Sequence, residues 1–257
     1  MSAAPSEPLD PALFGEPPAR DDRFTVVDRW ADCVNLPDDH AEKPIEFFHR
    51  QMNEELNVLE NAARNIAEFP DADWELRMWL ARQCADEARH ALVYRRILDC
   101  RGGWVGRYPV MNFQYRILGT IDTLIGRLAV QNRTFEADGL DAAVFAAQEA
   151  AASGDAELAE LFDAQQADEV VHIRFANDWI RQRVAAVPRD TLAMARALSR
   201  GATAFRQVFG GGGTEVTKYG VAQDARLLAG FDADEVRVAT DLAEARRARA
   251  RAATRGD

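Results

Sequence analysis

Residues 74–100 read WELRMWLARQCADEARHALVYRRILDC, and residues 156–186 read AELAELFDAQQADEVVHIRFANDWIRQRVAA. Both stretches carry apolar residues at helical spacing, and no alternating strand pattern persists elsewhere in the chain. Further long helices are expected over 44–70 and over about 113–138, the latter ending at Gly139. Four long helices with a long middle connection predict an all-α four-helix bundle with one crossover.

The rest of the chain lies on either side of this bundle. Residues 1–22 hold five of the ten prolines, which indicates an irregular N-terminal arm over 1–43. The bundle itself is expected over 44–187, followed by a helical C-terminal extension over 188–257 that packs on it. Within the extension, helices are expected to begin near residues 190, 214 and 232, the last with the capping-box spacing of Asp232 and Glu235.

The composition excludes several classes of protein. Of the 257 residues, 47% are hydrophobic and 28% charged, as in globular proteins. Charged residues interrupt every apolar run well before the roughly 18 residues that cross a bilayer, so we expect no membrane partner. The net charge of −11 argues against nucleic acid as a partner. Three cysteines without Cys-x-x-Cys spacing, and no secretion signal, indicate a cytoplasmic protein.

Two of the four histidines share a local pattern, DEARH at 86–90 and DEVVH at 168–172. A glutamate and a histidine three residues apart lie on one helix face, about 4.5 Å apart along the axis, so both can bind one metal ion. Acids make up 42 of 257 residues, so two such coincidences among four histidines have a chance of about half a percent. Acids within an apolar stripe also need a partner, because burial of an unpaired carboxylate costs several kcal/mol. His40 and His49 lack the full Asp-Glu-x-x-His pattern and are expected to be structural or to lie on the surface.

In each half of the chain, a further acid on the preceding helix is expected to complete the set of metal ligands. The spacing from Glu136 to Glu169 matches the spacing from Glu55 to Glu87 to within one position. Glu54 is the alternative to Glu55. Residues three or four positions apart along the helix form an apolar stripe with Glu55, whereas those that share a face with Glu54 are mostly polar. This favours Glu55 as the inward-facing acid.

The pattern of acids and histidine in the first half of the chain therefore recurs in the second half. The number of residues between corresponding positions varies by only one. Two helical hairpins related by a pseudo-twofold axis would bring six side chains to one centre, where four carboxylates balance two divalent ions. Oxygen-rich ligation with one imidazole per ion suits iron or manganese rather than structural zinc. The expected ligands are Glu55, Glu87, His90, Glu136, Glu169 and His172.

This ligand set resembles that of the ferritin-like di-iron carboxylate proteins, over about residues 44–186. The Glu-Leu-x-x-Leu-Glu run at 55–60, the Glu-Ala-x-Gly-Leu-Asp run at 136–141 and a Gly-Phe pair near the end resemble a bacterial branch akin to tRNA-hydroxylating di-iron enzymes. The resemblance implies that the acid before each motif glutamate orients the metal-bound histidine of the opposite half. By that analogy Asp86 orients His172, and Asp168 orients His90.

The resemblance also implies a di-iron oxidoreductase that uses dioxygen to hydroxylate or N-oxidise a small or carrier-bound organic substrate. Such a monooxygenase-type enzyme requires an external electron donor. Two Fe ions are expected, with Mn or a mixed Mn/Fe pair left open. Alternatives are iron storage or detoxification, a manganese catalase-like activity, tRNA hydroxylation, and a structural protein with vestigial ligands.

Two features of the leading hypothesis concern assembly and substrate. An enzyme fits a monomer or a homodimer, whereas iron storage requires a shell of many subunits. Residues one helical turn from the ligands are expected to line the substrate cavity. These are Gln51, Leu59, Tyr94, Asn132, Gln165 and Trp179.

Overall fold

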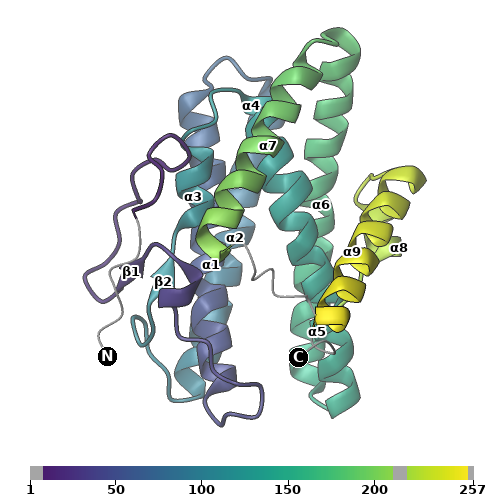
Figure 1. The fold of residues 1–257 in the computed structure, drawn as a ribbon. Helices are drawn as coiled ribbons and strands as arrows, with labels where there is room; N and C mark the ends of the chain where they lie inside the picture. The colour runs from purple at the N-terminus through teal and green to yellow at the C-terminus, as the bar shows by residue number, and fades with distance from the viewer. Residues whose placement is uncertain (1–7, 211–218, 254–257) are drawn as a thin grey trace. The chain divides into compact units, whose positions relative to one another are not determined.

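The structure is a computed structural model that describes residues 8–210 and 219–253 (Figure 1). Most of these residues are helical, which confirms the all-α prediction. The chain divides into two compact units, Met1–Leu124 with Arg196–Gly213, and Ile125–Ala195 with Thr214–Asp257. Within the described ranges, no helix combines the length and the apolar composition needed to cross a membrane. The three-part division at residues 43 and 187 stays a prediction.

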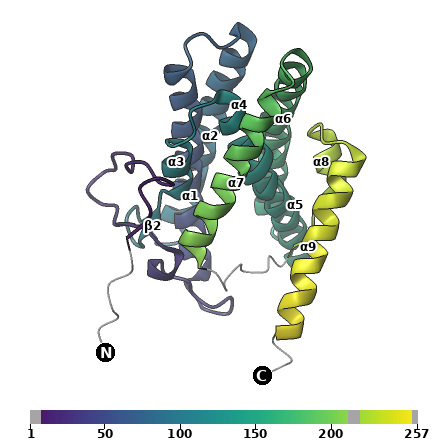
Figure 2. The ribbon, with the colours of Figure 1, turned by 45° about the horizontal axis from the view of Figure 1, so that its top comes forward.

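The first unit is built on a helical hairpin. Helix α1 (Lys43–Glu68) has Pro44 in its first turn, where a missing N–H costs no hydrogen bond. Helix α2 (Trp74–Cys100) lies beside it in both views (Figures 1 and 2). The Arg77 side chain joins their ends, since its Nη1 donates to the carbonyl oxygens of Ile66 and Phe69 at 2.9 and 3.1 Å. Both helices agree with the predicted ranges.

The N-terminal arm pairs with the connector that follows α2. Strand β1 (Val26–Val27) and strand β2 (Val110–Met111) are parallel, and a short 3₁₀ helix, η1 (Trp30–Asp32), follows β1. Two-residue strands are too short to produce the alternating pattern by which a strand is predicted. The Asn53 side chain of α1 donates to the Met111 carbonyl oxygen at 2.8 Å. The connector is thereby fixed to the hairpin.

The helix predicted over about 113–138 begins where expected, at Phe113, but it is interrupted and its last part ends later than predicted. The structure has α3 (Phe113–Leu118), a break, α4 (Leu124–Val130), the π-helical segment η2 (Gln131–Phe135) and α5 (Glu136–Ser153).

Two glycines explain the difference. At the break, a Cβ on Gly119 would lie 2.9 Å from a guanidinium nitrogen of Arg64, and that guanidinium donates to the Tyr115 carbonyl oxygen at 2.8 Å. Gly139 has no positive φ and open space around it, so the helix continues through this residue. It ends instead at Gly154, whose φ of 82° places it in the left-handed C-cap conformation.

The second unit contains the hairpin of α5 and α6 (Ala156–Ala186), which lie side by side in Figures 1 and 2. Asp155 caps α6, because its Oδ1 accepts from the Leu158 N–H at 3.0 Å. Helix α7 (Asp190–Phe209) follows, and its residues from Arg196 onward belong to the first unit. The predicted start near residue 214 lies outside the described residues, and the next helix observed is α8 (Gln223–Leu228).

The predicted capping box of the last helix, α9 (Ala233–Ala253), is present. The Glu235 N–H donates to Asp232 Oδ1 at 2.8 Å, and the Asp232 N–H donates to Glu235 Oε2 at 2.9 Å. The Glu235 carboxylate also pairs with Arg133 and Arg181, which lie in η2 and on α6. The start of α9 is thereby held on the hairpin of the second unit.

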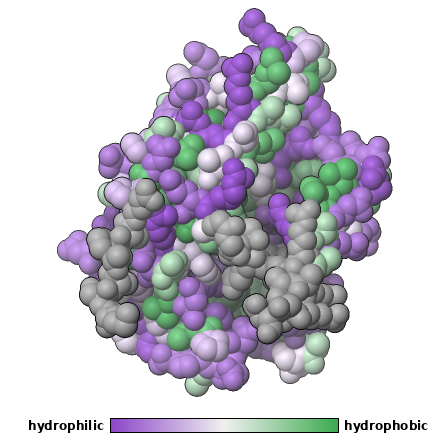
Figure 3. All heavy atoms as spheres, in the orientation of Figure 1, coloured by the Kyte–Doolittle hydropathy of each residue, from purple (hydrophilic) through white to green (hydrophobic). Residues whose placement is uncertain are grey.

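Helix α8 is divided into a buried and an exposed side. Ala225 and Ala229 belong to a buried cluster with Ala137, Leu140 and Ile173 of the hairpin. The opposite side exposes hydrophobic residues, and Figure 3 shows hydrophobic atoms over the α8–α9 part of this face. Helix α8 therefore packs against Ala137 and Ile173 of the hairpin. In the sequence these two residues directly follow the predicted ligands Glu136 and His172.

Candidate metal centre

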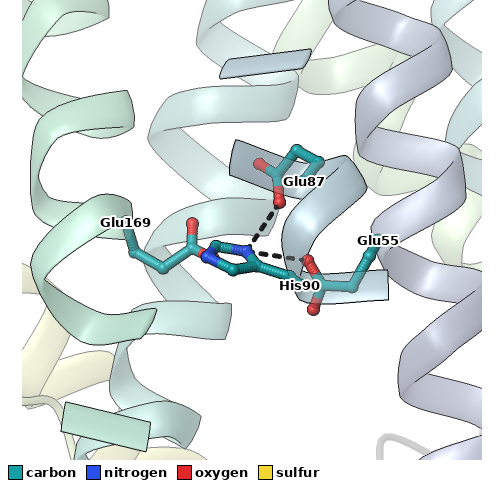
Figure 4. A group of neighbouring side chains, drawn as sticks. All are labelled: Glu55, Glu87, His90 and Glu169. Carbon is teal, nitrogen blue, oxygen red and sulfur yellow. Dashed lines mark hydrogen bonds and ion pairs between the residues drawn. The ribbon is translucent and has the colours of Figure 1, made fainter. Parts of the chain in front are cut away.

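The first unit buries three predicted ligands together. His90 Nδ1 lies 3.1 Å from Glu87 Oε2 and 3.4 Å from Glu55 Oε2, and the three side chains point toward one another from α1 and α2 (Figure 4). One ligand atom of each lies within 4.8 Å of the others. The exposed fractions are 6% for Glu55, 1% for Glu87 and 5% for His90. We call this group the α1–α2 trio.

The structure distinguishes the two neighbouring acids of α1. Glu55 faces His90, whereas Glu54 is half-buried and accepts a hydrogen bond from Gln114 Nε2 at 3.0 Å. Burial raises the pKa of Glu54 to about 7, against the opposing effect of nearby arginines. The acid that lies with the imidazole is thus the one that the apolar stripe favoured, and its role as a ligand stays a prediction.

The second unit buries the other three predicted ligands. Glu136, Glu169 and His172 each offer a ligand atom within 4.8 Å of the others, and we call them the α5–α6 trio. His172 Nδ1 lies 3.5 Å from Glu169 Oε2. The exposed fractions are 4% for Glu136, 6% for Glu169 and 1% for His172. Each hairpin therefore carries two buried carboxylates and one buried imidazole.

The backbone before Glu136 is irregular. Glu136 directly follows the π-helical segment η2, and π-helical turns inside α-helices occur frequently at functional sites. Within η2, Asn132 Nδ2 donates to Glu136 Oε2 at 3.1 Å and to the His172 carbonyl oxygen at 3.2 Å. The segment thus joins α5 to α6 at the trio. No pattern in the sequence predicted this segment.

Each trio could hold a divalent metal ion. Donor atoms that share one ion at about 2.1 Å lie roughly 3 to 4 Å apart. The separations between the imidazole nitrogens and the carboxylate oxygens, 3.1, 3.4 and 3.5 Å, lie in this range. Two carboxylates balance the charge of one divalent ion, and such an ion offsets the cost of burying them. A donor set of two carboxylates and one imidazole suits iron or manganese.

A protein-family model matches residues 3–237 of this chain. The chain belongs to that family, DUF455, which is described as a protein of unknown function. No curated protein and no solved structure matches the chain. Both trios lie inside the region that matches DUF455.

The two aspartates that precede the motif glutamates are half-buried in the DUF455 chain. Asp86 pairs with Arg82 at 3.3 Å and with Arg89 at 2.9 Å, both on α2. The histidine that each aspartate is predicted to orient belongs to the other unit. These two roles stay predictions.

The six predicted cavity residues of the DUF455 chain differ in their surroundings. Asn132 is buried against Glu136, and Tyr94 is buried with its ring 5.9 Å from that of Phe48. Gln165 is buried, and its Nε2 lies 3.4 Å from Glu169 Oε1. The remaining three, Gln51, Leu59 and Trp179, are half-buried.

Gln83 also lies at the site of this DUF455 protein, although it was not among the residues predicted from the sequence. Gln83 is 1% exposed, and its Nε2 lies 3.5 Å from Glu87 Oε1. The signal was available, because Gln83 precedes the first motif glutamate by one helical turn, as Gln165 precedes the second.

A small cavity lies in the first unit beside β2, with room for about one water molecule. Its lining includes His49 and Cys33, and none of the six predicted cavity residues, whose role stays a prediction. His49 Nε2 accepts from the Gly106 N–H at 3.0 Å, and burial lowers the pKa of His49 to about 4. Burial and the nearby Glu54 raise the pKa of the Cys33 thiol to about 11. His49 is therefore structural.

Proposed function

We propose that this DUF455 protein is a ferritin-like, non-haem di-iron oxygenase or oxidase. It would use dioxygen to hydroxylate or N-oxidise a small or carrier-bound organic substrate. The observation that carries the proposal is that each of two helical hairpins buries two carboxylates and one imidazole within 4.8 Å. Each trio would hold one iron ion, which gives two ions per chain.

The proposal further holds that the two ions form one dinuclear centre. Its support is the sequence, in which the two Asp-Glu-x-x-His motifs and their partner acids repeat with a nearly constant offset. The donor set supports it as well, since four carboxylates and two imidazoles match the ligand set of the di-iron carboxylate proteins. A bound iron pair supplies the electrons that reduce dioxygen during substrate oxidation.

The side chains of this chain have two tasks in the proposed reaction. The four carboxylates would neutralise the charge of the two ions. Less than a tenth of the surface of each glutamate is exposed, which keeps bulk water from them. The electrons would come from an external donor. The cysteines are all free thiols, which supports action in a reducing compartment such as the cytoplasm.

Single-turnover oxygen consumption tests the proposed function. The full chain would be loaded anaerobically with Fe(II) and mixed with dioxygen in a stopped-flow instrument. We expect rapid oxygen uptake with a transient visible absorption, and loss of both in a Glu136→Ala variant. Loaded protein that does not consume oxygen would contradict the proposal.

Two further readouts separate the alternatives that use the same ligands. Light scattering that shows a shell of many subunits, with many iron ions per chain, would favour iron storage. Oxygen evolution from peroxide by manganese-loaded protein would favour a catalase-like activity. A monomer or dimer that consumes oxygen supports the enzyme.

A further inference from the structure

A side-chain amide lies one helical turn before every predicted carboxylate ligand. Asn and Gln together make up 18 of the 257 residues, so a given position carries an amide with a chance of about 7%. Four independent matches at four sites would occur by chance roughly once in 40,000. The pairs are Gln51–Glu55, Gln83–Glu87, Asn132–Glu136 and Gln165–Glu169.

On α2, the amide and the imidazole approach different oxygens of one carboxylate. Gln83 Nε2 lies 3.5 Å from Glu87 Oε1, while His90 Nδ1 lies 3.1 Å from Glu87 Oε2. All three side chains are at most 5% exposed. The amide therefore holds one oxygen and leaves the other facing the imidazole.

The second unit repeats this arrangement on α6. Gln165 Nε2 lies 3.4 Å from Glu169 Oε1, and His172 Nδ1 lies 3.5 Å from Glu169 Oε2. In both hairpins, which belong to different units, the amide and the imidazole thus approach different oxygens of one carboxylate. A coincidence of packing in one helix does not explain this agreement.

The amide before Glu136 has an additional contact. Asn132 is 1% exposed and donates both to Glu136 Oε2 at 3.1 Å and to the His172 carbonyl oxygen at 3.2 Å. Asn132 therefore holds both the Glu136 carboxylate and the backbone of α6 at His172. Gln51 is half-buried and enters the inference only through its position in the sequence.

We propose that Gln83, Asn132 and Gln165 are positioning residues for the metal ions. Each would hold one oxygen of a ligand carboxylate and present the other to the ion; this rests on the proposed metal-binding function. An amide N–H is a neutral donor that stabilises the ionised carboxylate without competing for the ion. Loss of such an outer partner typically weakens metal affinity 10- to 100-fold.

Cobalt(II) titration of the full chain tests this role, because the visible spectrum of Co(II) reports its coordination independently of activity. In Gln83→Leu we expect one of the two ions to bind 10- to 100-fold more weakly, with an altered spectrum. Gln165→Leu and Asn132→Leu should weaken the ion of the other trio. Gln182→Leu, an exposed position of α6, is the matched control and should leave both affinities unchanged.

A second variant covers the case in which leucine prevents folding. Gln83→Glu keeps the shape of the side chain but replaces the donor N–H by an acceptor, and it should also weaken one ion. Unchanged affinity and spectrum in the variants, with two ions bound by the wild type, would overturn the positioning role and leave the proposed function standing. A wild type that binds no Co(II) would overturn the proposed function itself, and with it the positioning role.

Discussion

Glu87 and His90 lie one helical turn apart on α2, with the glutamate Oε2 3.1 Å from the histidine Nδ1 and both side chains buried. A buried carboxylate beside an imidazole is costly without further compensation, and a divalent cation supplies it. The second hairpin has the same pair in Glu169 and His172. Each hairpin therefore carries a donor set whose binding can be tested separately.

The choice between two adjacent acids of α1 can be tested directly. Glu55→Gln removes the carboxylate that lies 3.4 Å from His90, so we expect Fe(II) affinity of one of the two ions to fall at least tenfold. Glu54→Gln changes the neighbouring acid, which contacts Gln114 instead, and should keep both ions. Anaerobic equilibrium dialysis measures both. The reverse result would make Glu54 the ligand.

The buried ion pair that fixes α8 is predicted to be important for stability. Arg226 is 7% exposed and bonds both oxygens of Asp141, at 3.0 and 2.6 Å. Arg226→Leu leaves Asp141 buried without this partner, which should lower the free energy of unfolding by about 3–5 kcal/mol in urea denaturation. Arg237→Leu, on the exposed face of α9, should change it by less than about 1 kcal/mol. Equal losses in both variants would refute the prediction.

The pH dependence of stability should include a contribution from His49. Burial lowers its pKa from 6.5 to about 4, so between these values the unfolded chain binds more protons than the folded protein. Stability should therefore fall as the pH decreases from 6.5 to 4, by up to about 3 kcal/mol from this residue. Urea unfolding across this range measures the slope. His49→Asn should flatten it, and an unchanged slope would show that His49 does not contribute.

The cysteines should differ in reactivity. Burial and Glu54 raise the pKa of Cys33 to about 11, so only about 0.1% is thiolate at pH 8, against roughly a quarter for an unperturbed thiol. Cys100 is exposed on the last turn of α2. Mass spectrometry after brief iodoacetamide treatment at pH 8 should find Cys100 modified about 100-fold faster. Comparable rates would contradict the raised pKa that follows from the partly buried environment of Cys33.

The sequence was sufficient for the regular parts of the fold. Helices α1 and α6 begin where they were predicted, and each has a local signal there, Pro44 in the first turn of α1 and Asp155 before α6. Such signals can be found in the sequence because capping depends on neighbouring residues alone. The capping box of α9 followed from the same local chemistry. The proximity of each motif glutamate to its histidine could also be predicted, because helix geometry places residues three positions apart on the same face.

Features that depend on tertiary contacts could not be predicted in this way. Gly139 and Gly154 look alike in sequence, but only Gly154 adopts the left-handed conformation that ends a helix. The break at Gly119 depends on the approach of Arg64, which lies on α1 and is distant in the sequence. The π-helical segment before Glu136 has no local signature. Its position beside a predicted ligand became evident only in the structure.

The iron content of the loaded protein tests the central claim most directly. The full chain would be incubated anaerobically with excess Fe(II), freed of unbound metal on a desalting column and analysed for iron and protein. The two buried trios predict about two iron ions per chain, and about one in Glu87→Ala or in Glu169→Ala. A wild-type protein that retains no iron would contradict the assignment of these six side chains as ligands.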